Sequence, residues 1–311
     1  MHLKASKRSA TAATVLAVVV ILAVVWVVYR MNRVDDPADA ACSKPAVTFG
    51  SAEDHGDHRE VEVLFRCEGV ALAGTIYLPE AAGRHPAAVW VHGAGEATRL
   101  TWGGELLPSL VDAGVVVLSY DKRGVGESEG ECCPGDTGHF NLLTADAVGA
   151  VQALRRLPQV DPARVGLVGA SQAGWIVPRA SVDADAAFVA LAAAPTVAER
   201  TSNLYERLAA GEEGDLTEQE IADRLRDEGA QGYDPRADLE AMSMPGLWEF
   251  GTADEHTPSE QSIEVLDDLN ADGHDFTVMT FPGAGHGLLD NPPTDPDATP
   301  ALIRWITRHD T

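Results

Sequence analysis

Short apolar runs that alternate with helical stretches constrain the fold of this chain more than any other feature. The runs occupy residues 87–91, 115–120, 164–168, 188–192, 246–250 and 276–281. Helical patterns over residues 142–157 and 263–270 lie between some of them, and a last one covers 301–307. Strands that alternate with helices pack as a mostly parallel sheet covered on its faces. The sequence therefore predicts an α/β fold with a doubly wound sheet.

A hairpin and an inserted cap are expected to modify this plan. Residues 61–66 and 70–78 alternate apolar and polar side chains and are joined by Cys67, Glu68 and Gly69, which suits an N-terminal antiparallel hairpin. Residues 196–241 are charged, helical in pattern and too long for a plain loop. We therefore expect one domain over residues 59–311, with a small helical cap at about 196–241.

The N-terminal segment carries a membrane signal. Residues 10–29 contain no charge, follow three basic residues, and end with Trp26 and Tyr29. Twenty such residues in a helix span a bilayer, and aromatic side chains suit its interface. We predict a single-pass anchor over residues 1–33, a polar tether over 34–58, and a domain outside the cytoplasm. The alternative is a secreted protein whose signal peptide is cleaved near Ala40.

Charge and hydrophobicity exclude two broad classes of protein. Beyond the first 45 residues, 17 basic side chains stand against 45 acidic ones, a net charge of 17 − 45 = −28. Nucleic-acid binding is therefore not expected, because phosphates require a basic surface. A hydrophobic content of 45% also excludes global disorder.

Four cysteines lie on the presumed outer side, at positions 42, 67, 132 and 133. An even number in an oxidising compartment permits disulfides, but four cysteines allow three pairings. Their spacing matches no zinc motif. The alternative is that these residues are small apolar fillers, and the sequence leaves the pairing open.

A candidate nucleophile lies between one of the apolar runs and a helical stretch. The segment Gly169-Ala170-Ser171-Gln172-Ala173-Gly174 follows the run at 164–168. A serine on a sharp strand-to-helix turn exposes its hydroxyl, and this turn requires small residues two positions before and after the serine. Gly169 satisfies that requirement, whereas Ala173 stands where glycine is usual. Pro178 is expected to lie within the following helix and to kink it.

A nucleophilic serine needs a base and an orienting acid, and both follow in chain order. Asp254 comes after the run at 246–250, and His286 comes after the run at 276–281, among three glycines. We predict that these two residues complete a triad with Ser171. Three other acidic residues nearby are weaker candidates because they fall within the strand, beside Asp254 or past the histidine: Glu249, Glu255 and Asp290.

The loop after the first parallel strand is a candidate oxyanion hole. His92-Gly93-Ala94-Gly95 directly follows the run at 87–91. Acyl transfer needs two backbone N–H groups aimed at the oxyanion, one after the nucleophile and one from this loop. Gln172 and Ala94 would supply them, with Gly95 as the alternative to Ala94. A phosphate-binding loop is disfavoured because no GK[ST] continuation follows.

These residues together resemble a known superfamily. The ordered motifs are HGAG (92–95), YDKRGVGES (120–128), GASQAGW (169–175), GTADEHTP (251–258) and GAGHG (283–287). Over residues 61–307 the chain is similar to the α/β-hydrolases, in particular the bacterial serine esterase branch related to dienelactone hydrolases and acyl-peptide-type peptidases. The resemblance implies a Ser171-Asp254-His286 triad and a structural loop containing Asp121 and Arg123. The departures are Ala173, a short acidic cap and an insert at Glu131-Cys132-Cys133.

The expected activity is hydrolysis of small-molecule carboxylic esters through an acyl-enzyme, without a metal or an organic cofactor. A serine peptidase or aminopeptidase of the same fold is one alternative, and a non-catalytic anchored binding protein is another. Trp175 could face the substrate cavity, although core packing is the more usual place for such a residue. The residues indicate neither the acyl chain length nor the oligomeric state.

Overall fold

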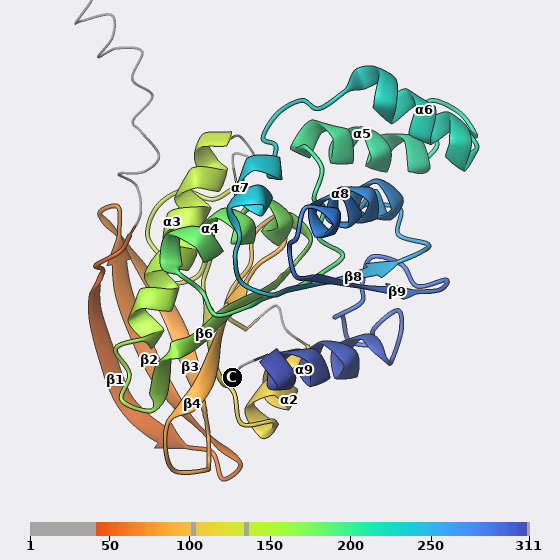
Figure 1. The fold of residues 1–311 in the computed structure, drawn as a ribbon. Helices are drawn as coiled ribbons and strands as arrows, with labels where there is room; N and C mark the ends of the chain where they lie inside the picture. Colours follow the sequence, from red (N-terminus) through yellow and green to blue (C-terminus); the bar gives the residue numbers. More distant parts are fainter. Residues whose placement is uncertain (1–41, 101–103, 134–136, 310–311) are drawn as a thin grey trace, which may run out of the picture. The chain divides into compact units, whose positions relative to one another are not determined.

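The computed structural model describes residues 42–100, 104–133 and 137–309 (Figure 1). Within these residues one nine-stranded sheet has the strand order β1-β2-β3-β5-β4-β6-β7-β8-β9. The strands are β1 (Ala46–Asp54), β2 (His58–Cys67), β3 (Val70–Pro79), β4 (His85–Val91), β5 (Val116–Tyr120), β6 (Val160–Ala170), β7 (Val189–Ala192), β8 (Gly246–Gly251) and β9 (Phe276–Phe281).

Helices cover both faces of the sheet, as Figure 1 shows. They are α2 (Leu106–Asp112), α3 (Thr137–Leu154), α4 (Val177–Ala184), α5 (Glu199–Ala209), α6 (Glu218–Glu228), α7 (Arg236–Ala241), α8 (Ser259–Ala271) and α9 (Ala298–His309). One apolar core lies between the sheet and α3, α4 and α8, and a second lies between the sheet and α2 and α9. The predicted α/β fold with a mostly parallel, doubly wound sheet is confirmed.

Parallel pairing brings the functional loops to one edge of the sheet. The strands β5, β4, β6, β7, β8 and β9 are parallel to one another, whereas β5 pairs with β3 on its other side in antiparallel orientation. The carboxyl ends of β4, β6, β8 and β9 therefore lie at the same edge. This is the edge at which open α/β sheets bind their ligands.

The predicted N-terminal hairpin is present as β2 and β3. Their antiparallel ladder closes at the pair Cys67 and Val70. Glu68 and Gly69 form the two-residue turn, with φ of 50° and 77°. Two positive φ angles match the right-handed twist of a tight hairpin, and glycine adopts the second of them without a steric penalty.

The predicted polar tether over residues 34–58 is wrong for its second half. Residues 46–54 form β1, which pairs with β2 in antiparallel orientation. Val47 and Phe49 alternate along it and pack against the core, while its other side chains are exposed. An edge strand has only one covered face, so its composition resembles that of a polar linker.

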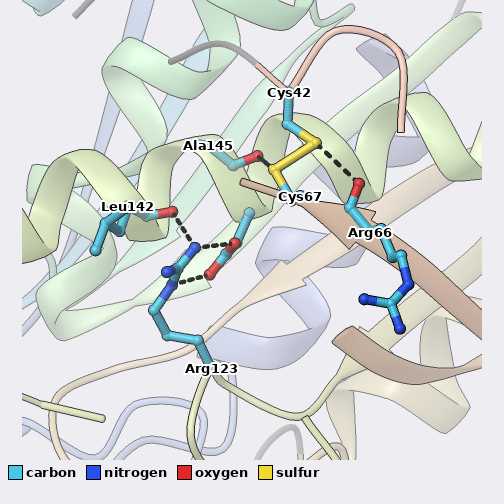
Figure 2. Close-up of a disulfide and its surroundings, with 7 residues drawn as sticks. Cys42, Arg66, Cys67, Arg123, Leu142 and Ala145 are labelled. Atoms are coloured by element: carbon cyan, nitrogen blue, oxygen red, sulfur yellow. Dashed lines mark hydrogen bonds and ion pairs between the residues drawn. A yellow bond between two sulfur atoms is a disulfide. The ribbon is translucent and has the colours of Figure 1, made fainter. Parts of the chain in front are cut away.

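Disulfides connect Cys42 with Cys67 and Cys132 with Cys133. Figure 2 shows the first bridge between the start of the described chain and the end of β2. The Cys67 sulfur also lies 3.1 Å from the Ala145 carbonyl of α3. The bridge therefore holds residue 42 against the junction of the sheet and α3. Neither pairing could be selected from the sequence.

The helical pattern predicted over residues 196–241 is present as α5, α6 and α7. Four side chains form a small separate core between α5 and α6: Leu204, Leu208, Ile221 and Leu225. Thr217 begins α6 with a capping box, in which its hydroxyl accepts from the Glu220 N–H and the Glu220 carboxylate accepts from the Thr217 N–H. We refer to α5, α6 and α7 as the cap.

The predicted membrane segment, residues 1–33, lies outside the described residues. In the part of the chain that is described, no helix is both long enough and apolar enough to cross a bilayer.

Candidate active site

Ser171 occupies a strained turn at the end of β6. Its φ is 55°, in the left-handed region, and a short 3₁₀ helix (Ser171–Trp175) follows directly. A Cβ at Gly169 would lie 2.7 Å from both the Ala173 Cβ and the Val91 carbonyl, so only glycine fits there. Ala173 is tolerated because Gly169 leaves room for its methyl group. Alanine in place of the usual glycine at position 173 is therefore compatible with the sharp turn that projects a nucleophile.

Pro178 does not kink a helix, which corrects the prediction made for it. The 3₁₀ helix ends at Trp175, and α4 begins at Val177 with the proline in its first turn. The first backbone N–H groups of a helix have no intrahelical partner, so the missing N–H of proline costs nothing at this position.

Ser171, His286 and Asp254 form one hydrogen-bonded chain, although they come from three separate loops. The His286 Nε2 atom lies 3.0 Å from the Ser171 Oγ atom. The His286 Nδ1 atom lies 2.9 Å from Asp254 Oδ2 and 3.1 Å from Asp254 Oδ1. When Nδ1 carries the proton, the imidazole donates to the carboxylate and accepts from the serine hydroxyl. The structure thus brings together the three residues predicted from the sequence.

The Asp254 carboxylate is fully buried and firmly held. Its Oδ1 atom accepts hydrogen bonds from the backbone N–H groups of His256 at 2.8 Å and Thr257 at 2.9 Å. The Tyr205 hydroxyl from α5 donates to the Asp254 backbone carbonyl at 2.7 Å. No local pattern indicates the contact with Tyr205, because 49 residues separate the two positions.

The other acidic residues do not occupy the position of Asp254. Glu255 is exposed. Glu249 is fully buried within β8, and the neighbouring Trp248 and Phe250 belong to the core beneath α3, α4 and α8. Because successive strand residues point to opposite faces, Glu249 points toward the α2 and α9 face. Asp290 lines the cavity that contains Ser171, whereas the carboxylate in contact with the His286 imidazole is that of Asp254.

The loop after β4 lies beside the serine. A Cβ at Gly93 would lie 3.4 Å from the Ser171 Cβ atom, so this glycine contacts the nucleophile. Gly93, Ala94 and Gln172 line the cavity, whereas Gly95 turns the chain with a φ of 79° and does not line it. This placement favours Ala94 over Gly95 among the two residues considered for the first N–H donor.

A buried lysine supports this loop from behind. The Lys122 Nζ atom donates to the Gly93 carbonyl at 2.6 Å, the Gly95 carbonyl at 2.9 Å and the Gln172 Oε1 atom at 3.1 Å. Burial lowers the pKa of Lys122 to about 8. Lys122 is not among the residues predicted for the site. A signal existed, because Lys122 is the single lysine after residue 45 and directly follows an apolar strand.

The cavity around Ser171 has a volume of about 310 Å³. Trp90, Trp175 and Leu289 supply apolar walls, and Asn203 and Glu206 of α5 supply a polar side. Trp175 both lines the cavity and packs in the core, because its ring contacts Phe140 and its Nε1–H donates to the Val197 carbonyl at 2.9 Å. The cap thus contributes one wall of the candidate site.

His256 links that wall to the catalytic loop. Its Nδ1 atom lies 2.8 Å from a Glu206 carboxylate oxygen, and its ring centroid lies 5.0 Å from that of His286. Within the described residues, no cluster of three or more His, Cys, Asp or Glu side chains could hold a metal ion. The arrangement provides a hydroxyl, an imidazole base and a buried carboxylate in series, which suits nucleophilic acyl transfer.

Two curated relatives match parts of the chain. The thiohydrolase aneE of Aspergillus aculeatus is 36% identical over 119 residues, which are 38% of this chain and 35% of that protein. The acylamino-acid-releasing enzyme of Arabidopsis thaliana is 25% identical over 205 residues, 62% of this chain and 26% of that protein. This chain therefore matches about a third or less of the length of either relative.

The fold and the family agree with the resemblance seen in the motifs. The crystal structure of acetyl xylan esterase 1 from a Thermoanaerobacterium species has a TM-score of 0.64 and 18% identity, covering 88% of this chain and 92% of that one. The model of the prolyl oligopeptidase family matches residues 105–309, well over half of the chain. The chain therefore belongs to the prolyl oligopeptidase family, a family of hydrolytic enzymes built on the α/β-hydrolase fold.

Proposed function

We propose that the protein hydrolyses carboxylic esters through an acyl-enzyme formed on Ser171. The observation that carries the proposal is the continuous hydrogen-bonded chain from Ser171 through His286 to Asp254 at the wall of the cavity. His286 removes the hydroxyl proton as Ser171 attacks the acyl carbonyl, and Asp254 stabilises the resulting imidazolium. His286 then protonates the leaving alcohol, and a water molecule releases the acyl group by the reverse sequence.

The developing oxyanion is assigned to the backbone N–H groups of Ala94 and Gln172. Both residues line the cavity: Gln172 directly follows Ser171 in the chain, and Ala94 lies in the loop after β4. Two N–H groups held in place before the reaction stabilise the tetrahedral intermediate without any reorganisation. Removing one such donor typically costs about 10²–10³ in turnover.

The size of the cavity supports a small acyl ester. A volume of about 310 Å³ lies at the lower end of the range for small-molecule sites. The apolar walls formed by Trp90, Trp175 and Leu289 suit a short acyl chain. An extended peptide would require a longer groove on both sides of Ser171. The match to the thiohydrolase adds thioesters to the substrates worth testing.

A serine peptidase or aminopeptidase is the second candidate function. It is favoured by the family assignment and by the relative that releases acylamino acids. The carboxylates of Glu206 and Asp290 line the same cavity as Ser171 and could attract a peptide α-ammonium group. Peptide cleavage would use the same nucleophile, base and acid.

The substitution Ser171→Ala tests the proposed nucleophile. It should reduce turnover of p-nitrophenyl esters by about 10⁶ and abolish labelling by a fluorophosphonate, because the attacking oxygen is lost. Ser109→Ala in α2 is the matched control and should retain full activity, because Ser109 does not line the cavity. Circular dichroism establishes that both variants are folded.

The substrate panel separates the candidate functions. Turnover of short-chain p-nitrophenyl esters well above that of aminoacyl-p-nitroanilides supports the esterase, and the reverse order supports the peptidase. Undiminished hydrolysis by folded Ser171→Ala would refute the assignment of the nucleophile. A folded wild type that neither hydrolyses any substrate nor reacts with the fluorophosphonate would favour the non-catalytic binding protein.

A further inference from the structure

Lys122 directs all three of its N–H groups at neutral oxygen atoms of the candidate site. Its side chain is 2% exposed, and its partners are two loop carbonyls and the amide oxygen of Gln172. The next residue, Arg123, behaves differently, because its guanidinium forms a bidentate ion pair with Asp146 at 2.6 Å and 2.7 Å. Burying an ammonium group is costly unless it is fully hydrogen-bonded. The chain therefore keeps a buried charge at this position although no carboxylate among the described residues forms an ion pair with it.

The bond to Gly93 has a geometrical consequence for Ala94. The Gly93 carbonyl and the Ala94 N–H belong to one planar trans peptide group and point in opposite directions. Lys122 binds the carbonyl side at 2.6 Å. Ala94 lines the cavity, and Gly93 contacts Ser171. Holding the carbonyl therefore holds the Ala94 N–H toward the position that the oxyanion would occupy.

The same ammonium group reaches the second donor segment. Its bond to the Gln172 side chain, at 3.1 Å, connects the loop after β4 to the first residue after the nucleophile. The positive charge of Lys122 beside the Gly93 carbonyl also polarises the peptide group between Gly93 and Ala94, which makes the Ala94 N–H a stronger donor. One side chain thus acts on both segments from which oxyanion donors are expected.

We propose that Lys122 is a positioning residue that orients and polarises the oxyanion hole formed by Ala94 and Gln172. The proposal rests on the ester-hydrolase function proposed above. Lys122 lies behind the loop and touches neither substrate nor nucleophile. Its contribution should therefore appear in the transition state, when negative charge develops on the acyl oxygen, and not in the binding of the neutral ester.

The substitution Lys122→Met removes the ammonium group and keeps most of the apolar stem. We expect kcat for p-nitrophenyl acetate to fall by about 10²–10³, the effect of losing an oxyanion donor, with KM changed less than about threefold. The rate of fluorophosphonate labelling should fall by a similar factor, because phosphonylation also builds charge on an oxygen in the hole.

Arg155→Met is the matched control. Arg155 also donates to three backbone carbonyls, those of Pro162, Ala184 and Asp185, but at the far end of α3. Its loss should lower the melting temperature without changing kcat. A folded Lys122→Met protein that retains wild-type kcat overturns the proposal. A Lys122→Met protein in which only KM rises and kcat is unchanged also overturns it. If the wild type is inactive on every ester, the proposed ester-hydrolase function is refuted instead. Failure of the Lys122 proposal is therefore distinguishable from failure of the proposed function.

The pH profile of the wild type provides a test that does not depend on the folding of a variant. Burial lowers the pKa of Lys122 to about 8, so the ammonium loses a proton, and one donor, as the pH rises past 8. The groups beside Lys122 are held in one state. His92 stays neutral because burial and the charge of Lys122 lower its pKa to about 3. The Asp121 carboxylate accepts hydrogen bonds from the backbone N–H groups of Arg99 and Glu127, and Arg123 is paired with Asp146. We expect kcat to decline above pH 8 without a fall in the melting temperature, because a lowered lysine pKa makes the folded state more stable as the pH rises from 8 to 10.5, and a flat profile to pH 10 overturns the proposal.

Discussion

Glu249 lies in the middle of β8 with its side chain fully buried, and neither carboxyl oxygen has a hydrogen-bond partner among the residues that the structure describes. Burial raises the pKa of Glu249 to about 8, and Arg304 of α9 opposes this shift only in part. The carboxyl is therefore protonated in the folded protein at neutral pH. Because Glu249 does not line the cavity that contains Ser171, its effect should be on stability and not on catalysis.

The raised pKa predicts how stability depends on pH. Between the ordinary pKa of 4.5 and about 8, the folded state keeps a proton that the unfolded state loses. The unfolded state thus binds fewer protons, and the free energy of unfolding falls as the pH rises through this interval, by up to about 1.4 kcal/mol per unit. Glu249→Gln removes this dependence, so its stability relative to the wild type should increase by a few kcal/mol between pH 4.5 and 8.

Urea unfolding at pH 5 and pH 8 measures the difference. The exposed Glu255→Gln is the control and should follow the wild type at both values. If the stability of Glu249→Gln differs from that of the wild type by the same amount at pH 5 and at pH 8, the carboxyl is not protonated by folding and the prediction fails.

The cap is coupled to the catalytic loop through one helix. From α5, Asn203 and Glu206 line the cavity, and the Tyr205 hydroxyl donates to the Asp254 carbonyl. The small core between α5 and α6 is separate from the two cores of the sheet. Helix α5 therefore has two functions, since it closes one side of the cavity and restrains the loop that holds the acid of the triad.

At this scale we predict that Tyr205→Phe lowers kcat for ester hydrolysis by about threefold to tenfold. The lost hydrogen bond is worth about 1 kcal/mol, and a looser Asp254 loop orients His286 less well. Tyr233→Phe is the control, because the Tyr233 hydroxyl donates to Asp238 within α7 and not to the loop that holds Asp254. Equal kinetics for the two variants would show that the contact with α5 has no role in positioning Asp254.

At the scale of the whole molecule, the N-terminal segment remains a prediction. Residues 1–33 carry the apolar stretch and its flanking basic residues, and every residue of the proposed site lies far downstream. The net charge of −28 beyond residue 45 favours a dispersed domain once that segment is removed. We therefore propose a single-pass anchor with the hydrolase domain outside the cytoplasm.

Deleting residues 1–33 should convert a protein that sediments with membranes into one that remains in the supernatant with unchanged kcat. Ultracentrifugation and ester hydrolysis of both forms measure this, with the full-length chain as the reference. A mature N-terminus near Ala41 in the culture medium would instead identify a cleaved signal. Protection of the domain from external protease in intact spheroplasts would reverse the proposed orientation.

The sequence by itself determined the fold class and the residues that meet at the site. Alternating strands and helices require a parallel sheet, and parallel strands end at one edge. Ser171 follows β6, Asp254 follows β8 and His286 follows β9, so these three residues could be predicted as neighbours before any distance was known. The hairpin was also predictable, because its alternation and its turn are local features.

Only the tertiary structure decided which distant residues support the site. The pairing of β1 with β2, the bridge from Cys42 to Cys67, and the contacts of Lys122 and Tyr205 all join positions that carry no local pattern. Local propensity records how a residue fits its own strand or helix, whereas these contacts depend on which segments the packed core brings together. The bridge joins residues 25 positions apart, Lys122 reaches Gly93 over 29 positions and Tyr205 reaches Asp254 over 49, so only folding brings these partners into contact.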